Sequence, residues 1–185
     1  MTKTEARKLA KACRAAVDLH TVGHAMAGVL FTLPAWQHAD TVLAFASMPD
    51  EPDTADILRQ ALAEGKRLLL PRVLSRTEMD WVEITALSQL QPGAYSILEA
   101  PASLPAFDTA HLGDGALALI PCLAASPDGV RLGRGGGYYD RFLAHYKGRR
   151  LLVCPTAALL GDLPCEGWDV RFSPHEILTE KGILL

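Results

Sequence analysis

Short apolar runs alternate with helical patterns along most of this chain. Residues 41–46 and 116–120 are almost wholly apolar, as strands buried on both faces of a sheet are. Residues 79–84 alternate between apolar and polar positions, which is typical of a half-exposed strand. The pattern predicts strands at residues 41–46, 67–73, 79–84, 116–120, 151–154 and 176–179.

The N-terminal segment has a helical pattern. Thr2 and Glu5 have the spacing of a capping box, in which each side chain accepts a hydrogen bond from the backbone of the other residue. Good helix formers follow. We therefore predict helical structure from this box to Pro34, with a break near Gly23.

Two further helices are predicted. Asp53 or Thr54 caps the first, which ends at Gly65, because glycine readily adopts the left-handed conformation found just after a helix. The second is short and covers residues 138–146. Residues 88–115 contain several prolines and are predicted to be rich in loops.

This alternation of buried strands and helices predicts an α/β fold. The central sheet should be mostly parallel, with both faces covered, and no linker divides residues 1–185, so we expect one domain. In such sheets ligands bind beyond the carboxyl ends of the strands. Three loops are therefore candidates for a binding site, those after Ala46, Val73 and Ile120.

Composition narrows the class of protein. The 185 residues are 49% hydrophobic and 21% charged, which is typical of a chain that builds a globular core. The formal net charge of -3 provides no broad positive field for nucleic acid or an anionic membrane. We find no C-x-x-C pair, no signal peptide and no apolar run of membrane length. We therefore expect a cytoplasmic protein that binds neither nucleic acid nor membrane. Composition does not give the oligomeric state, and we expect a monomer.

The strongest chemical signal is a glycine-rich segment between a predicted strand and a predicted helix. Residues 131–141 read Arg-Leu-Gly-Arg-Gly-Gly-Gly-Tyr-Tyr-Asp-Arg. Glycine lets the backbone approach a ligand closely, and successive N–H groups can then surround an anion. Arg131 and Arg134 add fixed positive charge that suits phosphate oxygens. The segment lacks the Gly-Lys-Ser/Thr of a Walker A loop, and Tyr138 replaces the third glycine of a dinucleotide-binding loop.

A second candidate is a pair of cations near the N-terminus. Lys3 and Arg7 are four residues apart, so a helix places them on one face, within its first two turns. Cations there oppose the helix dipole. Spacing alone nevertheless favours a solvated helix face over a binding site.

Three carboxylates are further candidates. Glu51 follows a predicted strand and needs no capping role, and a carboxylate can accept two adjacent N–H groups of a pterin-like ring. Taken alone, Glu51 is an ordinary polar loop residue. Asp140 and Asp169 carry oxygen ligands of the kind that Mg²⁺ takes. Asp140 has the alternative role of an acidic residue in the first turn of a helix.

Together these segments resemble the 5-formyltetrahydrofolate cyclo-ligase family over nearly the whole chain. The segment from Arg131 to Asp140 matches the family signature R-L-G-[YR]-G-x-G-Y-Y-D, and Lys3 with Arg7 matches its basic pair. Further segments match the folate loop or occur in family order: Ser47-Met48-x-x-Glu51-x-Asp53-Thr54, Leu70-Pro71-Arg72-Val73, Met79-Asp80 and Ile97-Leu98-Glu99-Ala100-Pro101.

The resemblance implies a three-layer α/β/α sandwich related to ribose-phosphate isomerases and coenzyme A transferases. It implies an enzyme that uses ATP and Mg²⁺ to close 5-formyltetrahydrofolate into 5,10-methenyltetrahydrofolate, releasing ADP and phosphate. Arg134 and Tyr138 would be the catalytic residues, and Asp140 and Asp169 would bind Mg²⁺. The implied substrate-binding residues are Ala46, Glu51, Arg134, Gly135, Gly136, Gly137 and Tyr138. The implied ATP-binding residues are Lys3, Arg7, Arg131, Leu132, Gly133, Arg134, Gly135, Gly136, Gly137, Tyr138 and Tyr139.

Two segments depart from the family pattern. Residues 121–126 read Pro-Cys-Leu-Ala-Ala-Ser where the family often has Pro-Gly-x-Ala-Phe-Asp, and Ala157 and Ala158 stand where an aromatic residue and a glutamine are common. Because of these changes, a paralogue of the family that acts on another heterocycle is an alternative function for this chain. A second alternative is a protein that binds folate without turnover, but storage alone would need no site for ATP.

Overall fold

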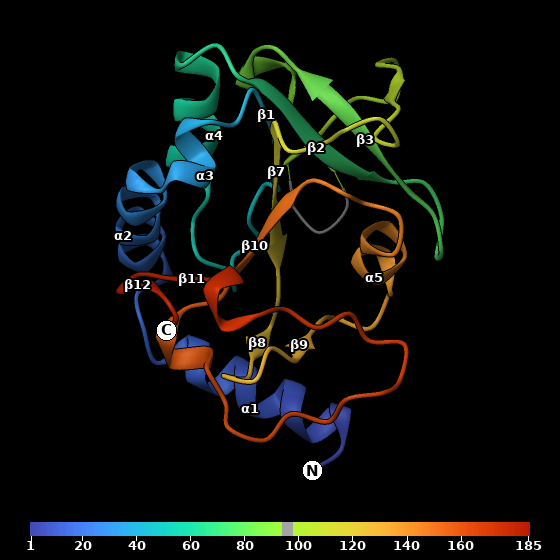
Figure 1. Cartoon of the computed structure of the whole chain (residues 1–185). Helices are drawn as coiled ribbons and strands as arrows, with labels where there is room; N and C mark the ends of the chain where they lie inside the picture. Colours follow the sequence, from blue (N-terminus) through green and yellow to red (C-terminus); the bar gives the residue numbers. More distant parts are fainter. Residues whose placement is uncertain (94–97) are drawn as a thin grey trace.

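Figure 1 shows a computed structural model of the chain, which describes residues 1–93 and 98–185. The described residues build an eight-stranded sheet with helices around it. The helices are α1 (Lys3–Ala15), α2 (Leu19–Thr32), α3 (Pro34–Gln37), α4 (Ala55–Ala63) and α5 (Tyr138–Leu143). The strands of this sheet are β1 (Thr41–Leu43), β2 (Arg67–Val73), β3 (Met79–Ile84), β6 (Ala106–Phe107), β7 (Ala116–Pro121), β10 (Arg149–Val153), β11 (Ile177–Thr179) and β12 (Gly182–Ile183).

Shorter elements complete the chain. The strand β4 (Gln91–Pro92) pairs with β5 (Leu98–Glu99), and β8 (Ala124–Ala125) pairs with β9 (Arg131–Leu132). Single turns of 3₁₀ helix lie at Leu87–Gln89, Thr156–Ala158 and Pro174–Glu176. The predicted loop-rich region, 88–115, thus contains only two-residue strands and the end of one 3₁₀ turn within its described part. Ile97 of the family-like segment lies outside the described residues.

The large sheet has a parallel centre and antiparallel edges. Its strand order is β12-β11-β10-β7-β1-β2-β3-β6, and neighbours from β11 to β2 run parallel. At one edge β3 runs antiparallel to both β2 and β6, and at the other edge β12 runs antiparallel to β11. The prediction of an α/β fold with a mostly parallel sheet is therefore confirmed.

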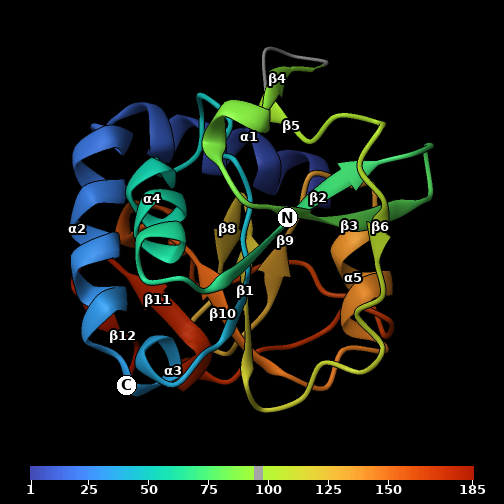
Figure 2. The ribbon, with the colours of Figure 1, turned by 90° about the horizontal axis from the view of Figure 1, so that it is seen from above.

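Side chains of the central strands enter two apolar cores, because successive residues of a strand face opposite sides of a sheet. In β7, Leu117 and Leu119 pack in the core that contains α2, α3 and α4 residues, whereas Ala118 and Ile120 belong to the core that contains α1 and α5 residues. Figure 2 shows α2 and α4 on one side of the sheet and α5 on the other. Burial on both faces accounts for the wholly apolar pattern of this strand.

The break in the N-terminal helical region lies earlier than predicted. Asp18 separates α1 from α2 and caps α2, because its side chain accepts a hydrogen bond of 3.1 Å from the His20 N–H. The prediction of a break near Gly23 was wrong, since this residue lies within α2. A Cβ atom on Gly23 would stand 2.2 Å from the Asp53 carbonyl oxygen. Glycine is therefore required there by close packing against the segment before α4.

The other predicted elements differ mainly in length. The capping box of α1 is present, with Thr2 and Glu5 bonding each other's backbone N–H groups at 2.7 and 3.2 Å. At α4 the Asp53 side chain accepts from the Ala55 N–H at 2.8 Å. β1 ends at Leu43, although the Ala44 N–H still donates to the Leu69 carbonyl oxygen of β2 at 2.9 Å, and α5 is also shorter than predicted. Within residues 1–93 and 98–185, no helix has the length and apolar character of a membrane span.

Candidate active site

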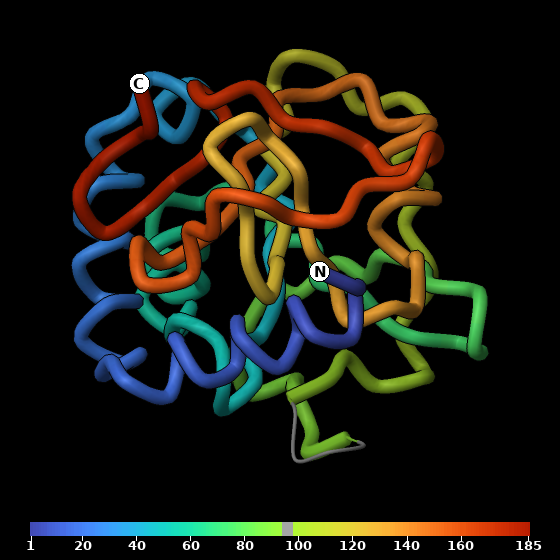
Figure 3. The backbone as a smooth tube through the Cα atoms, turned by 90° about the horizontal axis from the view of Figure 1, so that it is seen from below, coloured from blue at the N-terminus to red at the C-terminus, as the bar shows by residue number. Residues whose placement is uncertain are grey.

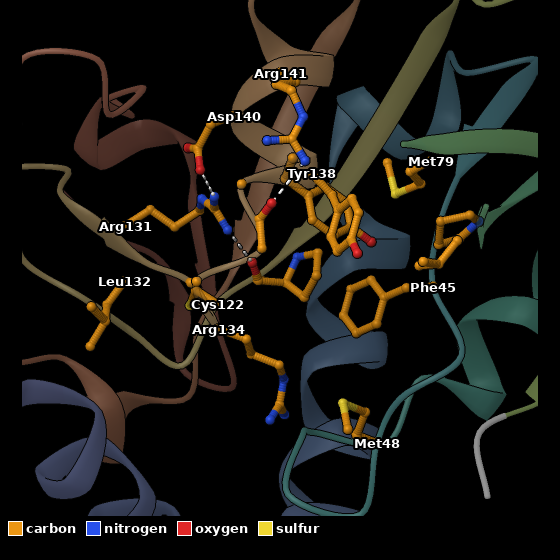
Figure 4. Close-up of a pocket in the computed structure, with 18 of the residues that line it drawn as sticks. Phe45, Met48, Met79, Cys122, Arg131, Leu132, Arg134, Tyr138, Asp140 and Arg141 are labelled. Atoms are coloured by element: carbon orange, nitrogen blue, oxygen red, sulfur yellow. Dashed lines mark hydrogen bonds and ion pairs between the residues drawn. The ribbon is translucent and has the colours of Figure 1, made fainter. Parts of the chain in front are cut away.

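A pocket of about 660 Å³ opens at the carboxyl ends of the central parallel strands. As predicted, segments that end or follow β1, β2 and β7 line it, with Met48, Val73 and Cys122 as examples. Figure 4 shows Phe45, Met48 and Met79 on one side of the view, and Arg131 and Arg134 on the other. The volume is that of a small-molecule site.

The glycine-rich segment reaches this pocket directly after the β8–β9 hairpin. Gly135 and Gly137 have φ angles of 103° and 67°, in the region that favours glycine. A Cβ atom on Gly136 would lie 2.5 Å from the Tyr138 ring. The path of the backbone along the pocket wall therefore requires glycine at these positions.

Arg131 is held at the inner end of this segment. Its guanidinium donates to Asp140 at 2.8 Å and to the Pro121 carbonyl oxygen at 3.2 Å (Figure 4), and it lies over the Tyr139 ring. Its side chain is buried, and its Nε has no hydrogen-bond partner among residues 1–93 and 98–185. A buried donor that the described protein atoms leave unpaired is suited to an oxygen of a ligand.

Arg134 joins the glycine-rich segment to the loop after β1. Its guanidinium binds both carboxylate oxygens of Asp50, and it donates to Glu51 Oε1 at 3.0 and 3.2 Å. Glu51 is buried, and its other oxygen accepts from the Met48 N–H at 2.9 Å. Arg134 and Glu51, which were predicted from separate segments, are therefore in direct contact.

These contacts shift the pKa values of the cluster. Burial alone would raise the pKa of Asp50, but hydrogen bonds from Arg134 hold it below its usual value. Burial alone would lower the pKa of Arg134, but the carboxylates of Asp50 and Glu51 raise it. Asp50 and Arg134 are both charged at neutral pH, so an anionic ligand would compete with carboxylates for the guanidinium.

Lys3 and Arg7 contact other elements as well as solvent. Lys3 Nζ donates to Glu166 at 2.6 Å and to Asp169 at 2.8 Å, and Arg7 Nε donates to the Gly133 carbonyl oxygen at 3.1 Å. Both side chains line the pocket. The interpretation as a solvated face, which spacing alone favoured, was therefore wrong.

The remaining predicted residues also lie in the pocket wall. Ala46, after β1, lines the pocket, and Leu132 is buried in β9. The Tyr138 hydroxyl donates to the Ser75 carbonyl oxygen at 2.8 Å, in the turn between β2 and β3. Burial raises the pKa of Tyr139 well above its usual range, so its phenol stays neutral.

The two predicted metal ligands line the same pocket, although they are far apart in sequence. Each has a cationic partner, with Arg131 2.8 Å from Asp140 and Lys3 2.8 Å from Asp169. In the part of the chain that the structure describes, no group of three or more His, Cys, Asp or Glu side chains is arranged to hold a metal ion. Carboxylates are nevertheless oxygen ligands of the kind that Mg²⁺ takes together with phosphate oxygens and water.

Arg14 is a residue of this region that sequence analysis missed. It is 1% exposed and donates to three backbone carbonyl oxygens, those of Cys122, Leu123 at 2.7 Å and Asp50 at 2.7 Å. It thereby ties the end of α1 to the loop after β7 and to the loop after β1. These two loops carry pocket residues, so Arg14 fixes their relative position.

Asp50 and Glu166 were also passed over. They supply ion pairs to Arg134 and Lys3, two cations of the pocket. An acidic loop residue has no distinctive local pattern, because its partner is set by the fold and not by neighbouring residues. Only the tertiary structure could have singled them out.

Comparison with known proteins bears on the family of this chain. A profile of the 5-formyltetrahydrofolate cyclo-ligase family matches residues 2–180. The 5-formyltetrahydrofolate cyclo-ligase of Mycolicibacterium smegmatis is 29% identical over 152 residues, which cover 78% of this chain and 76% of the relative. That of Escherichia coli K12 is 31% identical over 154 residues, which cover 80% of this chain and 84% of the relative.

Solved structures agree with these relatives. The NMR structure of Aquifex aeolicus 5,10-methenyltetrahydrofolate synthetase has a TM-score of 0.83 at 25% identity, covering 100% of this chain and 92% of that one. A 5,10-methenyltetrahydrofolate synthetase from Mycoplasma pneumoniae shares the fold, with a TM-score of 0.72 at 21% identity and coverage of 97% and 99%. The resemblance seen in the sequence is thus confirmed, and the chain belongs to the 5-formyltetrahydrofolate cyclo-ligase family.

Proposed function

We propose that this protein closes 5-formyltetrahydrofolate into 5,10-methenyltetrahydrofolate, using ATP and Mg²⁺ and releasing ADP and phosphate. Membership of the cyclo-ligase family supports the reaction. The observation that carries its assignment to this pocket is the contact between Arg134 and Glu51. It joins an arginine suited to phosphate and a carboxylate suited to a pterin-like ring within one cavity.

The cationic part of the pocket is suited to the triphosphate of ATP. Arg131 and Arg134 belong to the glycine-rich segment, Arg7 donates to its Gly133 carbonyl oxygen, and all three side chains line the pocket. The unpaired Nε–H of Arg131 would donate a hydrogen bond to a phosphate oxygen. Lys3 would also bind a phosphate group of ATP, after exchanging one of its carboxylate partners for that phosphate.

The apolar part is suited to the folate ring system. Phe45, Met48, Leu70 and Met79 line it. Glu51 adjoins this part and is held by the Met48 N–H, so the carboxylate is oriented before a ligand arrives. N–H groups of a pterin ring would bond this carboxylate, and such charge-assisted bonds are stronger than neutral ones.

Mg²⁺ would be held by Asp140 and Asp169 together with phosphate oxygens, and when bound it would neutralise charge on the triphosphate. Both carboxylates are oxygen donors in the pocket wall, so the donor set fits this use. Engaging them would also release Arg131 and Lys3 from their present ion pairs. Those cations would then be available to the nucleotide.

The proposed chemistry is phosphoryl transfer followed by ring closure. The N5-formyl oxygen attacks the γ-phosphate, and ADP leaves with the electron pair of the broken P–O bond. N10 then attacks the activated formyl carbon, N10 loses its proton, and phosphate leaves as the methenyl bridge forms. Arg134 would hold the transferring phosphoryl group with its planar fork of N–H donors, while the Tyr138 ring bounds the reacting centre. Positioning and charge neutralisation supply the rate, and no covalent nucleophile is required.

Formation of the methenyl product, followed by its absorbance, tests the proposal. Product should appear from 5-formyltetrahydrofolate only when ATP and Mg²⁺ are both present. Folate binding without product under all conditions would support the non-catalytic folate-binding protein. Failure to bind 5-formyltetrahydrofolate, with ATP-dependent turnover of another heterocycle, would support the paralogue.

Glu51→Gln tests the folate half of the pocket. It keeps the size of the side chain but puts a donor where an acceptor is needed, so folate affinity should fall about tenfold to hundredfold, or about 1.5–3 kcal/mol. ATP affinity should fall less, although Glu51 also holds Arg134. Titration calorimetry with folate and with a non-hydrolysable ATP analogue measures both. Glu83→Gln, an exposed glutamate on β3, is the matched control, and normal folate affinity in Glu51→Gln would remove Glu51 from the site.

A further inference from the structure

Trp168 is a solvent-exposed aromatic side chain that lines the pocket. It is 75% exposed, the largest exposure of any tryptophan in the chain, yet it lines the cavity that contains the glycine-rich segment. Within residues 1–93 and 98–185 its ring makes no aromatic pair and no cation–π contact. Single exposed apolar residues are common on protein surfaces. Its position at a ligand pocket is what calls for an explanation.

The turn that carries Trp168 is fixed. The Asp169 N–H donates to the Glu166 carbonyl oxygen at 3.0 Å, and the Glu166 N–H donates to the Asp169 carboxylate at 2.8 Å. Lys3 bonds both carboxylates of the turn from outside it. Figure 3 shows this orange-red stretch of chain passing beside the N-terminus. The indole is therefore presented by an anchored turn, which limits the entropy that a ligand must overcome on binding.

The neighbours of Trp168 identify the end of the pocket to which it belongs. Asp169 follows it in the chain and bonds Lys3, which lies on the same helix as Arg7. Arg7 in turn bonds the Gly133 carbonyl oxygen. These contacts place the turn at the cationic end, whereas the apolar lining around Phe45 comes from other elements, the ends of β1, β2 and β3. A flat ligand group reaching Trp168 would thus extend outward from the phosphates.

We propose that Trp168 stacks on the base of the bound nucleotide. The inference rests on the proposed use of ATP, and it adds the group that recognises the part of ATP beyond the phosphates. Base–aromatic stacking tolerates different bases, because every base has a π-face. The site should therefore accept purine nucleoside triphosphates as a class, with GTP binding through the same indole.

The experiment compares three ligands on Trp168→Ala, each with Mg²⁺, namely ATP, GTP and inorganic tripolyphosphate. Loss of the ring should weaken ATP and GTP about fivefold to thirtyfold. Tripolyphosphate has no base, so its affinity should be unchanged, which would also show that Asp169 and Lys3 keep their places. Trp168→Phe should restore most of the loss. Cys165→Ser, an exposed residue of the same segment that does not line the pocket, is the matched control.

Fluorescence gives a second reading in the wild-type protein. Trp36 and Trp81 are 1% and 3% exposed, so Trp168 is the tryptophan that a ligand in the pocket can reach. ATP should change the emission more than tripolyphosphate does, and Trp168→Ala should abolish the difference. Equal affinities for ATP in wild type and Trp168→Ala, or a loss confined to folate, would overturn the stacking while leaving the ATP-dependent reaction in place. A wild-type protein that binds no ATP and forms no product would overturn both.

Discussion

Arg134 has two carboxylate partners but only one guanidinium to share between them. Asp50 and Glu51 hold it from the loop after β1, and its side chain lines the pocket together with the glycines beside it. A guanidinium fixed before the ligand arrives needs little reorganisation when charge develops on a phosphoryl group. At the residue scale, this preorganisation is the main contribution that the chain can make to the proposed reaction.

Arg134→Ala should therefore lower the single-turnover rate at least about hundredfold, since removing one preorganised donor from a transition state has an effect of this size. Arg134→Lys should recover only part of the rate, because lysine keeps the charge and loses the planar fork. Arg59→Ala, which removes an exposed arginine paired with Asp56 on α4, serves as the control. If Arg134→Ala stays within about threefold of wild type, the loss is below about 1 kcal/mol and Arg134 has no part in the chemistry.

Asp50 predicts a pH dependence of stability. Its pKa in the folded protein lies below that of an unfolded aspartate, about 3.9, because Arg134 favours the charged form. Its stabilising contribution is thus fully present above about pH 4 and is lost as the pH falls through the lower folded value. Asp50→Asn should be less stable than wild type at neutral pH and should lose less stability on acidification.

Urea unfolding between about pH 2 and pH 6 measures this difference. Asp108→Asn, at an exposed aspartate outside the Arg134 cluster, is the matched variant. Parallel acid limbs for wild type and Asp50→Asn would mean that the pair with Arg134 does not contribute to stability.

At the scale of elements, local signals predicted what local chemistry controls. The start of α1 follows from the Thr2 and Glu5 capping box, and the glycine-rich segment follows from positive φ angles that only glycine adopts readily. The role of Gly23 could not be predicted, because close contact with Asp53 depends on how α2 packs.

Arg14 illustrates a signal that was present but not used. It lies on the same face of α1 as Ala6 and Ala10, and all three are buried. Helical spacing thus predicts an arginine inside the protein, and a buried guanidinium needs acceptors. Its acceptors are carbonyl oxygens of two loops, which no pattern in α1 could reveal.

Arg14→Ala should destabilise the protein by about 2–4 kcal/mol, because it leaves several buried carbonyl oxygens without donors. It should also weaken both substrates, since the loops that it joins carry Cys122 and Glu51 of the pocket. Urea unfolding and ligand titration on the same preparation measure the two effects. Lys11→Ala, at an exposed cation of α1, is the control, and a loss below about 1 kcal/mol would show that water replaces the guanidinium without difficulty.

At the scale of the whole molecule, the fold brings together segments that no periodicity relates. Lys3 lies near the N-terminus, Glu51 follows the first strand, and Asp140 and Asp169 belong to the C-terminal quarter of the chain. All four line one cavity. The parallel order of the sheet predicted that the loops after β1, β2 and β7 would meet. The approach of α1 and of residues 166–169 came only from the family resemblance, because neither segment follows a strand of the predicted pocket edge.

This arrangement predicts that loss of either aspartate weakens the use of Mg²⁺ but does not weaken the binding of metal-free ATP. Asp140 and Asp169 are proposed metal ligands, and each also neutralises a cation of the pocket, Arg131 or Lys3. Asp169→Asn should therefore raise the Mg²⁺ concentration needed for half-maximal rate, because a metal ligand is lost. The same change should leave the affinity for metal-free ATP unchanged or higher, because Lys3 loses one competing carboxylate. Asp140→Asn should have the same two effects, with Arg131 as the cation that loses a competing carboxylate.

Two measurements on one preparation separate this reading from simple damage to the pocket. Initial rates over a range of Mg²⁺ give the metal requirement, and titration of ATP in the presence of a chelator gives the metal-free affinity. Asp162→Asn, an exposed aspartate of the same segment as Asp169 that does not line the pocket, should change neither. A distorted pocket would weaken metal-free ATP together with the metal. An unchanged Mg²⁺ requirement in either variant would leave that aspartate as the ion-pair partner of its cation and no more.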